Sequence, residues 1–124
     1  MIDRRGTAAF AALFLFAVLT ASLSAHLAVV KTSPGKDQTL DRPPPQVQVW
    51  FNQPPSERVS RLELHGPDGE VALAELRVNR EDRSISAAVT GAPGAGRYEV
   101  RWRTAGNDGH VMRGTFAFSI ASKE

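Results

Sequence analysis

The sequence predicts an all-β protein: a seven-stranded Greek-key sandwich or barrel of the immunoglobulin-like type, preceded by a signal peptide. Three observations predict this fold. Apolar and polar residues alternate in short runs, which is the period of a β-strand. Turn-forming proline, glycine and aspartate residues separate the runs at intervals of roughly ten residues. After the N-terminal segment, no helical period extends beyond about two turns.

Each expected strand rests on its own alternation. In the clearest run, Tyr98, Val100 and Trp102 share one face, and charged residues occupy the other. Trp50 has the opposite parity to its apolar neighbours, so we expect it on the opposite face of its sheet. The clear strands are expected at 46–51, 61–65, 84–89, 96–103 and 115–120, and two weaker ones at 26–32 and 70–78. The weak run at 70–78 is the one stretch whose pattern also fits a short helix.

Turns and connectors account for the remaining positions. They are Ser33-Pro34-Gly35, Pro43-Pro44-Pro45, Gln53-Pro54-Pro55, Gly66-Pro67-Asp68-Gly69 and Gly91-Ala92-Pro93-Gly94. The three consecutive prolines predict a stiff, extended connector. We find no internal repeat and no sign of a second domain, so residues 26–124 are expected to form one domain.

The first 25 residues have the layout of a secretory signal peptide. Arg4 and Arg5 precede an apolar stretch, which ends in small residues at Ser24 and Ala25. The strongly apolar part is shorter than the roughly 20 residues that cross a bilayer, although an uncleaved anchor is the alternative interpretation. Cleavage after Ala25 would make His26 the first residue of the mature protein.

The charge and the cysteine content of the chain exclude several classes of function. The chain has 15 Lys and Arg against 13 Asp and Glu, a net charge of +2, which argues against a nucleic-acid binder. It has no cysteine, which excludes a disulfide scaffold, a thiolate metal site and a cysteine nucleophile. Export without cysteines suggests a bacterial periplasmic or cell-surface protein.

One pair of side chains stands out as a candidate metal site. No phosphate loop, nucleophile elbow or zinc-protease helix is present in the sequence. Asp108 and His110 are two residues apart, so in an extended segment their side chains point to the same side. A carboxylate and an imidazole together suit a divalent metal of borderline softness. The alternative is a plain Asp-Gly turn between the strands that flank residues 105–112.

A mature N-terminal histidine adds two further donors. A free α-amine has a pKa of about 8, so its deprotonation costs little near neutral pH. The amine and ring nitrogen of His26, the imidazole of His110 and the carboxylate of Asp108 would form an N3O set. Such a set suits tetragonal Cu(II). The alternative is that cleavage falls before a histidine by coincidence.

The other candidate ligands are less specific. His65 lies at a strand end before a turn, and we interpret it as a solvated surface histidine. Met112 is expected to be a loop or core side chain, because one thioether cannot build a multi-methionine Cu(I) site.

Across residues 26–124 the chain resembles the CopC family of periplasmic copper-binding proteins. The motifs that carry the resemblance are Ala25-His26-Leu27, Thr32-Ser33-Pro34, Val49-Trp50-Phe51, Leu62-Glu63-Leu64, Gly66-Pro67-Asp68-Gly69, the run from Gly96 to Arg103, Asp108-Gly109-His110 and the run from Gly114 to Phe118. The sequence departs from the family pattern at Gly106-Asn107 and Val111, which we expect to loosen the loop but to spare the ligands.

The resemblance implies a seven-stranded Greek-key sandwich that binds one Cu(II) per chain in the periplasm. It implies His26, Asp108 and His110 as the ligands, with His26 binding through its amine and its ring. Some members also bind Cu(I) through a methionine-rich loop, which this sequence lacks. The expected partners are the copper ion and an inner-membrane copper transporter of the CopD type, and we expect a monomer.

Three functions compete at this point. The first is a Cu(II) binder for copper resistance or homeostasis, which buffers or delivers copper and is not an enzyme. The second is a histidine-brace copper oxygenase. Asp108 argues against it, because it would complete the copper plane and leave no evident position for oxygen. The third is an immunoglobulin-like interaction module without a metal.

Overall fold

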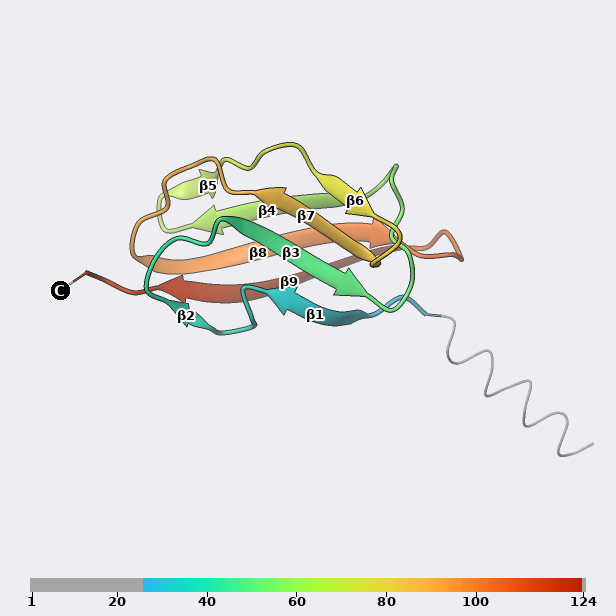
Figure 1. Cartoon of the computed structure of the whole chain (residues 1–124), viewed down its shortest axis with the longest axis horizontal. Helices are drawn as coiled ribbons and strands as arrows, with labels where there is room; N and C mark the ends of the chain where they lie inside the picture. Colours follow the sequence, from blue (N-terminus) through green and yellow to red (C-terminus); the bar gives the residue numbers. More distant parts are fainter. Residues whose placement is uncertain (1–25, 124) are drawn as a thin grey trace, which may run out of the picture.

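A computed structural model of the chain describes residues 26–123, and the predicted signal peptide lies outside the described residues. Nine strands form the fold (Figure 1). They are β1 (Val29–Ser33), β2 (Thr39–Leu40), β3 (Gln46–Phe51), β4 (Arg61–Gly66), β5 (Gly69–Val71), β6 (Arg77–Asn79), β7 (Ser84–Ala88), β8 (Gly96–Ala105) and β9 (Val111–Ile120). Among these residues no helix is long and apolar enough to cross a membrane.

The strands form two facing sheets. One has four strands in the order β1-β3-β7-β6, and the other has five in the order β2-β9-β8-β4-β5. All pairings are antiparallel except that of β2 with β9. The all-β sandwich that the alternating pattern predicted is therefore confirmed.

The number of strands differs from the prediction. The run at 70–78 is not one strand: β5 pairs with β4 in one sheet, and β6 pairs with β7 in the other. Between them, Leu73 makes a single bridge to Val89 as the chain crosses from one sheet to the other. The additional strand β2 is two residues long, too short for an alternation to reveal.

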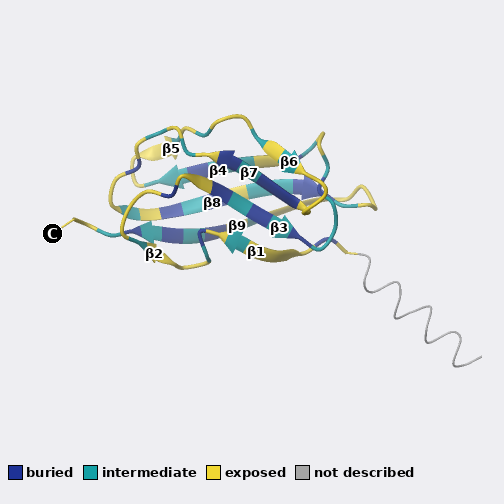
Figure 2. Ribbon diagram, viewed as in Figure 1, coloured by how far each residue is buried: buried dark blue, intermediate teal, exposed yellow. Residues whose placement is uncertain are grey.

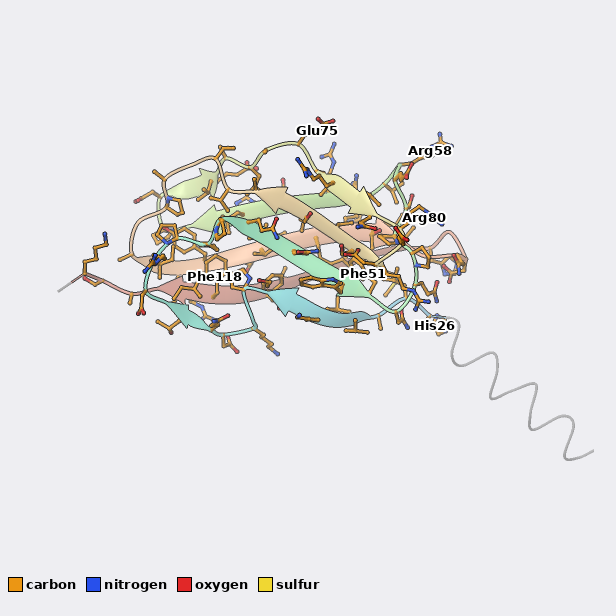
Figure 3. All side chains as sticks on the ribbon, viewed as in Figure 1. His26, Phe51, Arg58, Glu75, Arg80 and Phe118 are labelled. Carbon is orange, nitrogen blue, oxygen red and sulfur yellow. The ribbon has the colours of Figure 1, made fainter. Side chains whose placement is uncertain are left out.

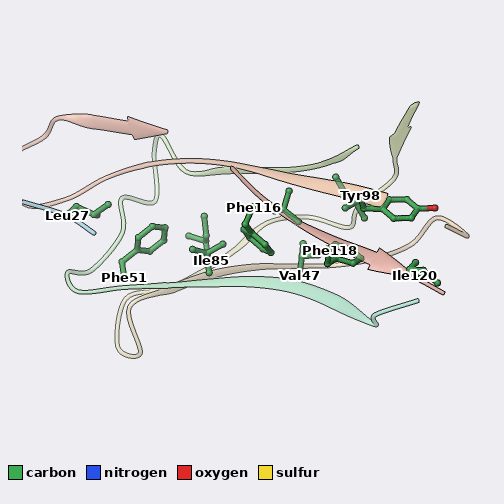
Figure 4. Packing of buried hydrophobic residues seen from close by; sticks show 11 residues of the cluster. Leu27, Val47, Phe51, Ile85, Tyr98, Phe116, Phe118 and Ile120 are labelled. Carbon is green, nitrogen blue, oxygen red and sulfur yellow. The ribbon is translucent and has the colours of Figure 1, made fainter. Parts of the chain in front are cut away.

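Apolar side chains from both sheets fill the space between them (Figure 4). In β3 every second residue is buried, as its pattern predicted, and Figure 2 shows the same alternation along neighbouring strands. Trp50 lies on the opposite face, where Lys31 Nζ is 4.7 Å from the centre of its ring. Trp102 meets Phe51 edge to face, with ring centres 5.3 Å apart.

The β8–β9 hairpin is longer than predicted and sets the length of the connecting loop. The two strands pair continuously from Gly96 opposite Ile120 to Ala105 opposite Val111, so the loop comprises only residues 106–110. The alternation fails at the start of β9 because Gly114 interrupts it. A Cβ at Gly114 would overlap the indole of Trp102, so this glycine provides space for the indole and does not end the strand. Met112 lies in this strand and is exposed, which corrects its interpretation as a loop or core residue.

Candidate metal centre

The described chain begins at the end of the sandwich that also carries the β8–β9 loop (Figure 1). Leu27 is 5% exposed and belongs to the hydrophobic core, whereas His26 and Ala28 on either side are exposed. Figure 3 shows His26 at this end of the molecule. Burial of Leu27 therefore anchors a short segment whose first residue is open to solvent.

Asn52, which follows β3, holds the N-terminal segment by three hydrogen bonds. Its side-chain Nδ2 donates to the carbonyl oxygen of His26 at 3.0 Å, and its Oδ1 accepts from the N–H of Ala28 at 2.8 Å. Its own backbone N–H donates to the carbonyl oxygen of Ala28 at 3.0 Å. The backbone on both sides of Leu27 is thus fixed to the end of β3.

The loop of residues 106–110 is organised by its own hydrogen bonds. The N–H of Gly109 donates to the carbonyl oxygen of Gly106 at 3.1 Å, and Gly109 has a φ of 76°. This left-handed conformation favours glycine, because a Cβ would crowd the backbone. The N–H of His110 donates to Asp108 Oδ1 at 3.1 Å. Asp108 and His110 therefore approach each other through a turn, and not through the extended segment that the sequence analysis assumed.

The turn brings a carboxylate and an imidazole side by side in solvent. His110 Nδ1 lies 3.5 Å from Asp108 Oδ2. The His110 side chain is 80% exposed and that of Asp108 is 35% exposed. Two ligands held about 2.0–2.2 Å from one metal ion lie about 3–3.5 Å apart, so this pair has nearly the spacing of two donors to one ion.

Gln53 and Gly106 bring the loop and the N-terminal segment together. The N–H of Asn107 donates to Gln53 Oε1 at 3.0 Å. A Cβ at Gly106 would lie 2.5 Å from Gln53 Oε1 and 3.2 Å from the Cβ of Leu27. The loop therefore packs against the residue that follows His26, and a larger side chain at Gly106 would separate them.

The predicted ligands are thus held at one end of the sandwich, but their donor atoms are not assembled. Among the described residues, the ring and carboxylate donors of His26, Asp108 and His110 do not all lie within 4.8 Å of one another. The α-nitrogen of His26 is part of a peptide bond in the full sequence and becomes an amine only on cleavage after Ala25. These three residues are called the end-loop site below.

Comparison with known proteins identifies the fold and its lineage. The model of the CopC domain matches residues 29–121, most of the chain. The chain belongs to the CopC domain family. This CopC domain is 28% identical over 115 residues to the copper transport protein CutJ of Bacillus subtilis (strain 168). The match covers 90% of this chain and 21% of that protein, so the chain spans about a fifth of the length of the curated relative.

Solved structures show the same fold. CopC from Methylosinus trichosporium OB3b superposes with a TM-score of 0.70 at 21% identity, covering 80% of this chain and 97% of that one. PcoC, a copper resistance protein from Escherichia coli, superposes with a TM-score of 0.68 at 20% identity, covering 76% of this chain and 99% of that one. These identities are low, so the likeness establishes the sandwich and not the ligands.

Sequence reasoning missed the two amide side chains that organise this end of the CopC domain. Asn52 and Gln53 follow β3 directly, before Pro54 and Pro55. Two adjacent amides at a strand end can each join a different segment, because each offers both a donor and an acceptor. Their position at a strand end indicated that they could join neighbouring segments, but nothing in the sequence showed which segments would reach them.

Proposed function

We propose that the processed chain, residues 26–124, is a periplasmic Cu(II)-binding protein of copper resistance or homeostasis. Family membership supports a copper role, since the relatives above are described as copper transport and copper resistance proteins. The observation that carries the proposal is the packing of Leu27 beneath the loop that bears Asp108 and His110. That packing keeps the mature N-terminus next to two exposed donors.

One Cu(II) ion would be held by four donors of the end-loop site. His26 supplies its α-amine and ring nitrogen, Asp108 a carboxylate oxygen and His110 a ring nitrogen. An N3O set in a plane suits Cu(II), which also heads the affinity order of the divalent metals. The carboxylate offsets part of the ion's charge, and Asn52 limits the movement of the His26 backbone. With four planar donors in place, we expect no oxygenase activity.

Exposure of the ligands suits a protein that hands its metal on. His110 is largely open to solvent, so an incoming ligand can reach the copper ion from outside. A copper transporter of the CopD type in the inner membrane would be such an acceptor. The same exposure suits a buffer that exchanges copper with the periplasmic pool.

The decisive experiment is native mass spectrometry of protein exported to a bacterial periplasm, with and without one equivalent of Cu(II). We expect a mature mass that begins at His26 and retains one copper ion. Correctly cleaved His26→Ala protein should keep the amine but lose the ring donor, and should bind Cu(II) far more weakly. His65→Ala is the matched histidine control and should retain copper. A mass that begins elsewhere, or unchanged affinity in His26→Ala, would refute the assignment.

A further inference from the structure

A second group of metal-binding side chains lies on the outer face of the five-stranded sheet. Glu63 and His65 point to the same face of β4, and Glu70 lies directly opposite His65 on β5. Their ligand atoms all lie within 4.8 Å of one another, which among the described residues is true of no other such group. These three residues are called the sheet-face cluster below.

His65 differs from the solvated surface histidine that the sequence suggested. Its side chain is 25% exposed, and its Nε2 is closed to solvent and without a hydrogen-bond partner. Glu63 Oε2 is the nearby acceptor at 3.7 Å, too far for a hydrogen bond. A buried ring nitrogen that faces a carboxylate without reaching it can serve as a metal ligand, because a cation between the two would satisfy both groups.

Charges of both signs surround the cluster. Glu99 on β8 also lies opposite His65, but its carboxylate accepts a hydrogen bond from Arg101 Nε at 2.7 Å. That hydrogen bond is the largest cause of a raised pKa for Arg101, against a smaller opposing effect of burial. Arg101 lies directly opposite Glu63, but its Nε is held by Glu99, and Glu63 and Glu70 raise the pKa of Arg101 less than Glu99 does.

We propose that Glu63, His65 and Glu70 form a second metal site, for a divalent cation of the Zn²⁺ class. One imidazole and two carboxylates leave a fourth tetrahedral position for water, as in zinc sites with three protein ligands. Zn–N and Zn–O bonds of about 2.0–2.2 Å place neighbouring ligand atoms about 3.3 Å apart. The 3.7 Å between Glu63 Oε2 and His65 Nε2 is close to that spacing. Small side-chain rotations therefore suffice to close the set around one ion.

The site is tested in mature protein whose end-loop site is disabled by the substitutions His26→Ala, Asp108→Asn and His110→Ala. Titration calorimetry with Zn²⁺ alone, in a buffer that does not bind metals, should show one equivalent bound. His65→Gln and Glu70→Gln should each weaken binding at least about tenfold, since each removes a direct ligand. Because the background lacks all three end-loop side-chain ligands, the result is independent of the proposed Cu(II) function.

Two controls make the outcome specific. Glu75→Gln removes an exposed carboxylate from the connection between β5 and β6 (Figure 3), outside the cluster, and should leave Zn²⁺ affinity unchanged. Mg²⁺, which prefers all-oxygen ligands, should not compete at equal concentration. The proposal would be overturned if the parent protein bound no Zn²⁺ or if it bound Mg²⁺ as tightly as Zn²⁺. It would also be overturned if His65→Gln and Glu70→Gln both bound Zn²⁺ as tightly as the parent.

Discussion

The end-loop site and the sheet-face cluster offer similar donors on very different supports. The first takes its donors from the start of the mature chain and the loop of residues 106–110. The second takes all of its donors from β4 and β5, where strand register fixes their spacing. Consequently the donors of the sheet-face cluster lie within 4.8 Å of one another, whereas those of the end-loop site do not.

This difference bears on what each site can do. Strand-borne donors are positioned before a metal arrives, so little ordering is needed on binding. The loop and terminal donors that we propose must be gathered around the ion, and the α-amine of His26 would be created only by cleavage after Ala25. A site built from loop and terminal donors, such as the end-loop site, can be switched on by export and can release its metal through an exposed face.

The largest expected effect comes from blocking the α-amine alone. Acetylation of the α-amine of His26 leaves every side chain in place but removes the amine as a ligand. We expect Cu(II) affinity to fall by about 100-fold or more, since loss of even an outer-shell contact costs about 10- to 100-fold. Zn²⁺ binding at the sheet-face cluster should be unchanged. Competition with a chromophoric chelator measures both affinities in the same protein. Equal Cu(II) affinity of the acetylated and free forms would exclude amine ligation.

A smaller effect is expected at Asn52, which touches no proposed ligand atom. Asn52→Ala removes the side-chain hydrogen bonds to His26 and Ala28, and should lower the free energy of unfolding by about 1–2 kcal/mol. Since the N-terminus is then less ordered, Cu(II) affinity should fall about tenfold. Urea unfolding and the same chelator competition measure the two quantities.

Asn52→Asp provides the matched comparison for this clamp. Aspartate keeps an acceptor for the N–H of Ala28 but has no donor for the carbonyl oxygen of His26. Its copper affinity should lie between those of the wild type and Asn52→Ala. If Asn52→Ala bound Cu(II) as tightly as the wild type, ordering of the N-terminus would have no part in binding.

The sequence was informative wherever local pattern determines structure. The alternation of Val47, Val49 and Phe51 located β3 correctly, because side-chain burial in a strand has a period of two. The run at 70–78 was misread, because its residues divide between two sheets and Leu73 meets its partner only through tertiary contact. Gly114 concealed the first residues of β9, since its role is to accommodate Trp102 on the neighbouring strand.

The candidate sites show the same limit. The spacing of Asp108 and His110 is visible in sequence, and the structure places them together, although through a turn. Their role as ligands stays a prediction. The sheet-face cluster could not be anticipated, because Glu70 reaches His65 only through the register of β4 and β5. Asn52 and Gln53 were missed for a similar reason: their partners are distant in sequence and adjacent only after folding.

The smallest expected effect concerns the conformation of the loop itself. Gly109 has a φ of 76°, and no atom beyond its immediate chain neighbours lies within 4 Å of where a Cβ would lie, so Gly109→Ala tests local backbone strain alone. We expect a loss of about 1 kcal/mol in stability. If the alanine variant relaxes the loop without copper, Cu(II) affinity should fall by up to about fivefold, the equivalent of that energy. Gly94→Ala, where a Cβ also meets open space but φ is not left-handed, should cause no loss of either quantity. Zn²⁺ affinity at the sheet-face cluster should be the same in both variants, because no strand moves. Equal losses in the two variants would show that the left-handed turn at Gly109 is not the cause of the effect.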